Sequence, residues 1–251
     1  MDLERKVSKS IDALREFARK YNGVWISFSG GKDSTTTLLL ALEALPRSMI
    51  RGIVFIEVTG NTHELNIHYV YEVCEKLGVS DMLIHLRRDD IEFFECIERW
   101  GIPTRHYRWC FNEFKVTMFN VIKPPIFIAG VKNKDSKTRM LWDWTKPQRI
   151  SGRIVFSPIA DWNDEDVINY VRSRNMSLCP CYELYGHSGN CMFCPMHTKD
   201  KIMKTASDPY WGLKILRALK KCRGRWCSEY VRKWSRFVGS KSLLRWLNGG
   251  E

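Results

Sequence analysis

A short glycine turn carries the residue types that bind an anion. Residues 29–34 read Ser-Gly-Gly-Lys-Asp-Ser. Two glycines let the backbone turn tightly and bring its N–H groups close to a ligand. Lys32 adds a mobile positive charge, and the hydroxyls of Ser29 and Ser34 can donate hydrogen bonds to phosphate oxygens. The predicted phosphate-binding residues are therefore Ser29, Gly30, Gly31, Lys32, Asp33 and Ser34.

The turn lies between a predicted strand and a predicted helix. An apolar run at 24–28 precedes it, and a run rich in Thr and Leu at 35–45 follows it. The positive end of such a helix points at the same anion. A Walker A motif is excluded, because Ile26 stands where that motif needs glycine and Asp33 where it needs Ser or Thr.

Strands alternate with helices over most of the chain. We predict strands at 24–28, 52–58, 82–86, 126–130 and 154–156, and helices at 2–21, 34–45, 63–77, 91–100 and 165–174. This alternation predicts an α/β fold with a doubly wound, mostly parallel five-stranded sheet flanked by helices. Ligands of such sheets bind beyond the carboxyl ends of the strands, where the glycine turn falls.

Composition predicts three regions: an α/β domain at 1–176, a Cys-rich segment at 177–196 and a basic helical tail at 197–251. The net charge is +12, and residues 196–251 hold 14 Lys and Arg against four Asp and Glu. Basic and aromatic residues alternate there, as in Arg232-Lys233-Trp234, which suits nucleic acid as a partner. The alternative is that the aromatic side chains pack the tail while the charges stay solvated.

Nothing in the sequence predicts a membrane partner. The first residues are charged, and no apolar run approaches the roughly 20 residues needed to span a bilayer. We therefore expect a cytoplasmic protein. It has nine cysteines, gathered toward the C-terminal half, and in a reducing compartment this pattern favours metal binding or catalysis over disulfides.

The glycine turn resembles the pyrophosphate loop of the superfamily of ATP-pyrophosphatases and phosphoadenosine phosphosulfate (PAPS) reductases. Thr59 and Gly60, followed by Glu64, resemble the segment that lines the nucleotide pocket in this family, although Val58 replaces its usual Asp. An ordinary turn with a helix cap is the alternative interpretation. The resemblance implies an adenine-nucleotide-binding domain at 1–176, with ATP, or adenosine phosphosulfate (APS) or PAPS, as the nucleotide.

Residues 130–139 resemble the family's Gly-x-Arg-x-x-Glu-Ser-x-x-Arg stretch. Gly130 lets the chain leave its strand close to a ligand, and Ser136 aligns with the family serine. Lys132 and Arg139 would hold phosphate or sulfate oxygens, but Lys132 replaces an arginine and so loses a bidentate fork. A solvated charge run after a strand is the alternative.

Residues 158–167 resemble a further family segment, Pro-Ile-x-Asp-Trp-x-x-x-Asp-Val. We expect a largely structural role for this one. Asn163 or Asp164 can cap the following helix, and Trp162 is expected to pack in the core.

The cysteines predict an inorganic centre. Cys191 and Cys194 form a C-x-x-C pair that can bind zinc or iron. Arg108-Trp109-Cys110, followed by Lys115, resembles the element with which cluster-bearing family members hold a four-iron four-sulfur cluster beside the nucleotide. The resemblance implies the ligands Cys110, Cys181, Cys191 and Cys194, with Cys179 as the substitute for Cys181. Structural zinc and free thiols remain alternatives.

These motifs together favour ATP cleavage between the α- and β-phosphates, which adenylates an acceptor for sulfur transfer. The residues expected to act in that step are Lys32, Asp33, Lys132 and Arg139, with Mg²⁺ held by the phosphates and Asp33. The basic tail makes nucleic acid a candidate acceptor, and a homodimer or a sulfur-donor protein is a further candidate partner; the sequence does not identify the acceptor. The alternatives are an APS or PAPS reductase that releases sulfite, and a zinc-stabilised nucleic-acid-binding protein with a vestigial nucleotide fold.

Overall fold

The computed structural model describes residues 2–122, 126–135, 140, 146–223 and 227–238. The chain forms two compact units, each assembled from separate stretches of sequence. The sheet unit comprises Met1–Ile56, Ile67–Leu86 and Met118–Cys179, and the helical unit comprises Glu57–Asn66, Arg87–Thr117 and Pro180–Glu251. The domain boundaries expected after residues 176 and 196 stay predictions.

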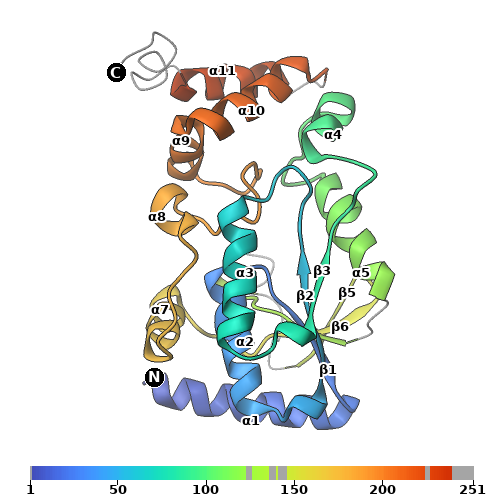
Figure 1. The fold of residues 1–251 in the computed structure, drawn as a ribbon, viewed down its shortest axis with the longest axis vertical. Coiled ribbons are helices and arrows are strands. Elements are labelled where there is room, and N and C mark those ends of the chain that lie inside the picture. The colour runs from blue at the N-terminus through green and yellow to red at the C-terminus, as the bar shows by residue number, and fades with distance from the viewer. Residues whose placement is uncertain (1, 123–125, 136–139, 141–145, 224–226, 239–251) are drawn as a thin grey trace. The chain divides into compact units, whose positions relative to one another are not determined.

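A six-stranded sheet forms the centre of the sheet unit, in the order β3-β2-β1-β4-β6-β5 (Figure 1). The strands are β1 Val24–Ser27, β2 Ile50–Ile56, β3 Leu83–Leu86, β4 Ile126–Ile128, β5 Gln148–Ile150 and β6 Arg153–Phe156. All neighbours pair in parallel except β5, which runs antiparallel to β6. The predicted α/β class and mostly parallel sheet are confirmed.

The sixth strand, β5, is the one departure from the predicted five. It joins β6 through Ser151 and Gly152, whose φ angles of 49° and 77° match a tight hairpin turn. β5 is only three residues long and lies at the edge of the sheet. It therefore has no run of apolar residues from which a strand could be predicted.

Helices cover both faces of the sheet. The helices described in this unit are α1 Leu3–Tyr21, α2 Lys32–Ala44, α3 Glu64–Lys76, α5 Thr117–Ile122 and α7 Asp164–Ser173. On one face, Phe127 packs with Phe119 of α5 at 4.6 Å between ring centroids. Ile128, the next residue of β4, points to the other face of the sheet. Its partner on β6, Phe156, stacks there on Phe17 of α1 at 4.8 Å between ring centroids. The sheet is therefore doubly wound, as the alternation predicted.

The described part of the helical unit contains α4 Phe93–Trp100, a π-helical turn at Phe111–Val116, α8 Cys181–Tyr185, α9 Lys199–Ser207, α10 Pro209–Lys221 and α11 Cys227–Val238. The basic tail is thus helical over its described length. Trp211 and Trp234 are buried in this unit, so some of the tail's aromatic side chains do pack, whereas Tyr210 is 64% exposed. None of the helices described has the length and apolar character to cross a membrane.

Candidate functional site

The glycine turn lies where β1 ends and α2 begins. β1 has β2 on one side and β4 on the other, so the strand order reverses at this point. Open α/β sheets bind ligands beyond the carboxyl ends of the strands at such a reversal. Gly30 has a φ of 70°, a conformation that favours glycine, and Gly31 stands at the N-cap of α2 without a side-chain cap. The N-terminus of α2 is therefore an end that a phosphate can cap.

Ser34 holds the turn in shape. Its hydroxyl accepts a hydrogen bond from the Ser29 backbone N–H at 3.1 Å and donates to the Gly31 carbonyl at 2.9 Å. The two serine hydroxyls lie 3.1 Å apart. Ser34 thus has a structural task that the sequence did not reveal, and its contact with phosphate stays a prediction.

Gly130 follows β4 and touches the start of α2. A Cβ atom at this position would lie 2.6 Å from the carbonyl carbon and oxygen of Asp33 and 2.8 Å from the Ser34 nitrogen. These are backbone atoms, which cannot swing aside as a side chain can. Only glycine therefore lets the end of β4 approach the turn, and this approach brings Lys132 to the same place.

Two lysines and two aspartates form one charge network at this point. Lys32 Nζ lies 3.1 Å from Asp33 Oδ2 and 3.1 Å from Asp164 Oδ1. Lys132 Nζ lies 2.8 Å from Asp33 Oδ1, an ion pair without hydrogen-bond alignment, and it donates a short hydrogen bond to Asp164. The Lys132 residue is only 3% exposed. The structure therefore brings together three predicted residues, Lys32, Asp33 and Lys132, and adds Asp164.

Asp164 is the residue that sequence reasoning missed. Its position in the first turn of α7 suggested a helix cap, but Asn163 is the cap, in a capping box with Asp166. Asp164 instead accepts from both lysines. Trp162, in the same segment, is fully buried as expected.

The network stabilises the charged forms of Lys32 and Asp164. For Lys32, burial lowers the pKa, but the Asp33 and Asp164 carboxylates outweigh burial and the pKa is raised overall. For Asp164, burial raises the pKa, but the hydrogen bond from Lys132 and the charge of Lys32 outweigh burial and the pKa is lowered overall. The Lys32 ammonium group is therefore charged near neutral pH, as anion binding requires.

We expect Asp164→Asn to destabilise the protein in a pH-dependent way. A lowered folded-state pKa means that Asp164 contributes stability above its ordinary value of 3.8, which is lost as the pH falls through the folded-state pKa. The raised pKa of Lys32 adds stability that is lost only as the pH rises above 10.5. The difference in free energy of unfolding between wild type and variant, measured with urea, should be constant from about pH 5 to about pH 9. It should vanish in stronger acid. Asp161→Asn, which removes an exposed ion pair with Lys9, should have little effect, and an equal loss in both variants would contradict the network.

The other predicted nucleotide residues are placed as follows. Ser136 and Arg139 lie outside the described residues. Thr59 belongs to the helical unit, where its hydroxyl donates to the Arg88 carbonyl and its own carbonyl accepts from the Phe93 N–H at 2.9 Å. Gly60 follows with a φ of 79°. Thr59 and Gly60 thus shape the entry to α4, and their contact with nucleotide stays a prediction.

The predicted cysteine centre belongs to the helical unit. Cys110 precedes the π-helical turn, and Cys191 and Cys194 lie in the loop between α8 and α9. Burial is the main cause that raises the pKa of Cys191 to about 12; Lys115 lowers it, and Cys194 and Cys110 raise it. Burial, followed by the neighbouring Cys194, also raises the pKa of Cys110. Cys191 is thus under the electrostatic influence of Cys110 and Cys194, and Cys110 under that of Cys194.

This donor set fits an iron–sulfur cluster in its chemistry. All three donors are sulfur, and the Lys115 and Arg108 cations favour the thiolate that a metal needs. In their present arrangement, however, no three His, Cys, Asp or Glu side chains of the described residues form a metal-binding group. The cluster and its ligands therefore remain a proposal.

The fourth predicted ligand is placed differently. Cys181 is fully buried at the start of α8, and its sulfur would lie 2.6 Å from a Cβ atom at Gly189. Cys181 is not among the groups that chiefly shift the pKa of Cys110 or Cys191. Its substitute, Cys179, is also fully buried and belongs to the sheet unit.

Asn61 holds the turn between the two cysteines of the C-x-x-C pair. Its backbone carbonyl accepts from the Met192 N–H at 2.8 Å. Its side chain accepts from the Phe193 N–H at 2.8 Å and donates to the Phe193 carbonyl at 3.0 Å. Asn61 is fully buried. Asn61 belongs to the segment around Thr59 and Gly60, which by resemblance lines the nucleotide pocket. The same segment therefore also positions the cysteine loop, and no sequence pattern predicted this role.

We expect Asn61→Asp to loosen this loop. A carboxylate cannot donate to the Phe193 carbonyl, and it places an uncompensated charge in a fully buried position. The free energy of unfolding should fall by about 1–3 kcal/mol or more. Cys191 and Cys194 should react faster with a thiol reagent. Asn112→Asp, at an exposed position of the same unit, is the control, and equal thiol reactivity in wild type and N61D would contradict the role given to Asn61.

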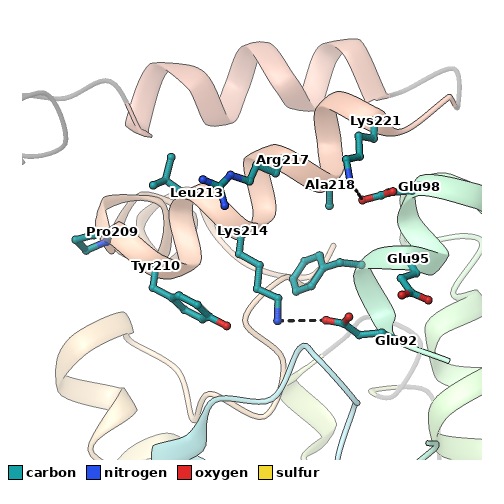
Figure 2. A pocket seen from close by; sticks show the side chains of 11 residues that line it. Glu92, Glu95, Glu98, Pro209, Tyr210, Leu213, Lys214, Arg217, Ala218 and Lys221 are labelled. Atoms are coloured by element: carbon teal, nitrogen blue, oxygen red, sulfur yellow. Dashed lines mark ion pairs between the residues drawn. The ribbon is translucent and has the colours of Figure 1, made fainter. Parts of the chain in front are cut away.

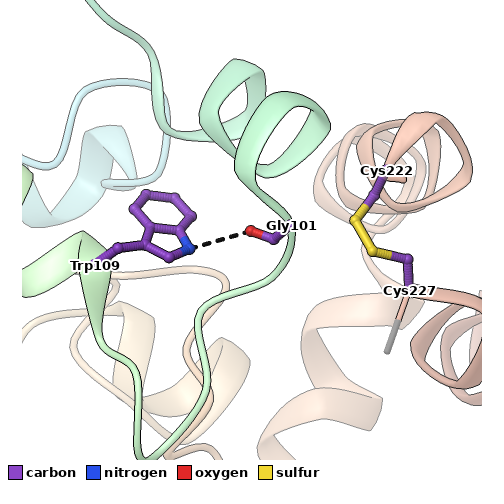
Figure 3. The surroundings of a disulfide bond; sticks show 4 residues. All are labelled: Gly101, Trp109, Cys222 and Cys227. Atoms are coloured by element: carbon purple, nitrogen blue, oxygen red, sulfur yellow. Dashed lines mark hydrogen bonds between the residues drawn. A yellow bond between two sulfur atoms is a disulfide. The ribbon is translucent and has the colours of Figure 1, made fainter. Parts of the chain in front are cut away.

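A disulfide joins Cys222 to Cys227, between α10 and α11 (Figure 3). The cysteine pattern had favoured metal binding or catalysis and did not predict this bond. In the same unit the Trp109 indole donates to the Gly101 carbonyl at 3.1 Å, which fixes the residue next to Cys110.

Comparison with known proteins identifies the family of this chain. The family model described as phosphoadenosine phosphosulfate reductase domain matches residues 23–196. An uncharacterized protein of Methanocaldococcus jannaschii, MJ0066, is 28% identical over 239 residues, which cover 89% of this chain and 45% of that protein. Sulfate adenylyltransferase subunit 2 of Mycolicibacterium vanbaalenii is 23% identical over 203 residues, 72% of this chain and 63% of that protein. The chain thus spans about half to two thirds of the length of these relatives.

A solved structure shares the fold. The U34-tRNA thiolase NcsA from Methanococcus maripaludis, solved with its [4Fe-4S] cluster, superposes with a TM-score of 0.50 at 14% identity. The match covers 96% of this chain and 82% of the thiolase. At this identity the likeness establishes the fold alone.

Proposed function

The chain belongs to the phosphoadenosine phosphosulfate reductase domain family, and from this premise we propose that it cleaves ATP between the α- and β-phosphates to adenylate an acceptor for sulfur transfer. The observation that carries the proposal is the meeting of Lys32 and Lys132 at the uncapped N-terminus of α2. Two ammonium groups and a helix end at one point suit a polyphosphate. The similarity to a sulfate adenylyltransferase subunit supports an adenylating reaction.

In the proposed reaction an acceptor hydroxyl or enol oxygen attacks the α-phosphorus. The bond from that phosphorus to the bridging oxygen breaks, and pyrophosphate leaves. The charge on the leaving pyrophosphate grows during this step, and Lys32, Lys132 and the α2 backbone N–H groups would stabilise it. Asp33 would contribute to a Mg²⁺ site on the phosphates, and Asp164 holds both lysines in place.

Sulfur enters in the second step. Hydrosulfide, the co-reactant, attacks the activated carbon, and AMP leaves with the original acceptor oxygen. The overall reaction converts ATP, hydrogen sulfide and a hydroxyl acceptor into AMP, pyrophosphate and a thiol product, without oxidation or reduction. A cluster held by Cys110, Cys191 and Cys194 would supply a binding site for the sulfide. The cluster of the similar thiolase structure supports this part of the proposal.

Product analysis tests the proposal. Protein reconstituted anaerobically with iron and sulfide is mixed with Mg²⁺, ATP, sodium sulfide and cellular RNA, and the nucleotide products are separated. AMP and pyrophosphate in equal amounts are the expected result. ADP and phosphate, or no RNA-dependent turnover, would contradict it.

One observation favours a second candidate, the reduction of APS or PAPS to sulfite. Cys222 and Cys227 are close enough to form a disulfide. In their reduced form the pair could supply the two electrons: one thiol takes the sulfonate and displaces the nucleotide, and the second thiol releases sulfite and leaves the disulfide. One sulfite per reduced protein, abolished in a Cys222→Ser, Cys227→Ser double variant, would support this reaction. Activity that survives in the double variant would exclude these thiols.

A further inference from the structure

We propose that a small aromatic cavity beside Cys194 binds a single nucleobase of the nucleic acid that accepts sulfur. The inference rests on the proposed function, because it specifies the acceptor. The cavity lies within the helical unit and has a volume of about 240 Å³. Its lining includes Cys194, the rings of Phe193, Tyr230 and Trp234, and the exposed side chain of Arg105.

The size of the cavity selects the occupant. The cavity volume is about 240 Å³. It falls below the range of about 300–1,000 Å³ that holds whole small-molecule ligands. A free nucleotide is therefore too large, whereas one planar heterocycle attached to a chain outside the cavity fits.

The walls suit a planar heterocycle. Phe193 lies 5.9 Å from Trp234 and 6.1 Å from Tyr230, measured between ring centroids, so three rings form one aromatic surface. Aromatic surfaces of this kind bind unstacked bases, and each base has a π-face that can stack. Proteins that act on a base take it out of the stack and hold it between such side chains.

A polar group in the wall lacks a partner. The Trp234 residue is 2% exposed, and its indole N–H has no acceptor among the described residues. The indole can only donate, and an unsatisfied buried donor is costly. The indole nitrogen is closed to water in this structure, so a bound base reaches it only when the rings shift; nucleobases carry the carbonyl oxygens and ring nitrogens that would then accept the hydrogen bond. At the rim, the Arg105 guanidinium donates to the Pro195 carbonyl at 3.4 Å and places a positive charge where the phosphate chain would pass.

A larger cavity of the same unit fits nucleic acid less well. It has a volume of about 830 Å³ and lies between α4 and α10 (Figure 2). Its basic side chains are largely neutralised within the protein, because Lys214 pairs with Glu92 and Lys221 with Glu98, each at 3.2 Å. A third carboxylate, Glu95, adds negative charge that repels phosphate. Tyr210 and Arg217 of this cavity therefore serve as control positions.

Photocrosslinking tests the inference. The probe is a pool of random-sequence RNAs of about 16 nucleotides, each with one 5-iodouridine, which crosslinks to aromatic side chains in contact with the base. A matching DNA pool with 5-iododeoxyuridine distinguishes RNA from DNA as the source of the base. We expect crosslinked peptides that contain Phe193, Tyr230 or Trp234. Trp234→Leu should lower the crosslink yield about tenfold, as the loss of one stacking ring predicts.

Two further variants keep the test valid if Trp234→Leu folds poorly. Trp234→Phe keeps a ring but removes the donor, and Arg105→Ala changes only an exposed side chain; both should weaken crosslinking. Tyr210→Leu and Arg217→Ala, the matched controls, should not. Crosslinks confined to Tyr210 or to the surface would overturn the inference. Crosslink yields unchanged in the Trp234 and Arg105 variants would also overturn it. Pyrophosphate release is measured on the same samples, so crosslinks without release would reject the proposed reaction and leave the nucleobase site standing.

Discussion

Replacing Lys32 with alanine should lower ATP-dependent pyrophosphate release by roughly 10²–10³-fold. Lys32 is the cation of the glycine turn, and it pairs with both Asp33 and Asp164. A donor aimed at the charge that develops on the leaving pyrophosphate contributes mainly in the transition state. The loss should therefore appear chiefly in kcat, measured by a coupled assay for pyrophosphate.

The Lys9→Ala variant is the matched control. Lys9 is also a lysine of the sheet unit in an ion pair, with Asp161 at 2.8 Å, but its side chain is 57% exposed and lies on α1. Its loss should leave pyrophosphate release unchanged. Lys32→Arg, which keeps the charge, should retain more activity than Lys32→Ala. Equal rates of pyrophosphate release in wild type and Lys32→Ala would show that the glycine turn does not take part in the reaction.

Replacing Cys191 with alanine should lower the iron content of the reconstituted protein at least about tenfold. Cys191 is the first cysteine of the C-x-x-C pair, and the neighbouring Cys194 and Cys110 both act on it electrostatically. In the proposed centre, loss of one of the three sulfur ligands Cys110, Cys191 and Cys194 would leave too few donors to hold a cluster. Iron and acid-labile sulfide are measured after anaerobic reconstitution.

Cys96→Ala is the control for this experiment. Cys96 is a core residue of α4, 2% exposed, and burial raises its pKa to about 11. The Cys96 variant should therefore keep its iron. Zinc in place of iron in the wild-type protein would favour a structural metal site. If Cys191→Ala keeps its iron, Cys191 is not a ligand of the centre.

The fold was predictable because hydrophobic pattern and turn residues agree along the sheet unit. Apolar runs such as 24–28 and 126–130 became central parallel strands, since both their faces are covered by helices. Gly130 was predicted from a motif, and the backbone atoms that surround it explain why glycine is needed there. Lys32, Asp33 and Lys132 were placed at one site on the same grounds.

The remaining parts depend on contacts between residues that are distant in sequence. Asp164 looked like an ordinary first-turn acid, and only the packing of α7 near the turn gives it two lysine partners. Asn61 has a common turn residue type, and its bonds to Phe193 span 132 positions. The Cys222–Cys227 bond depends on how α10 and α11 meet, which spacing does not specify.

A crystal structure with α,β-methylene-ATP, in which the scissile bond cannot break, tests the central claim most directly. The account predicts the β- and γ-phosphates at the N-terminus of α2, against the backbone of 30–34. Lys32 and Lys132 should each lie within hydrogen-bond distance of phosphate oxygens, and Asp33 should face a bound Mg²⁺. Nucleotide bound elsewhere, with both lysines still paired only to Asp33 and Asp164, would contradict the account.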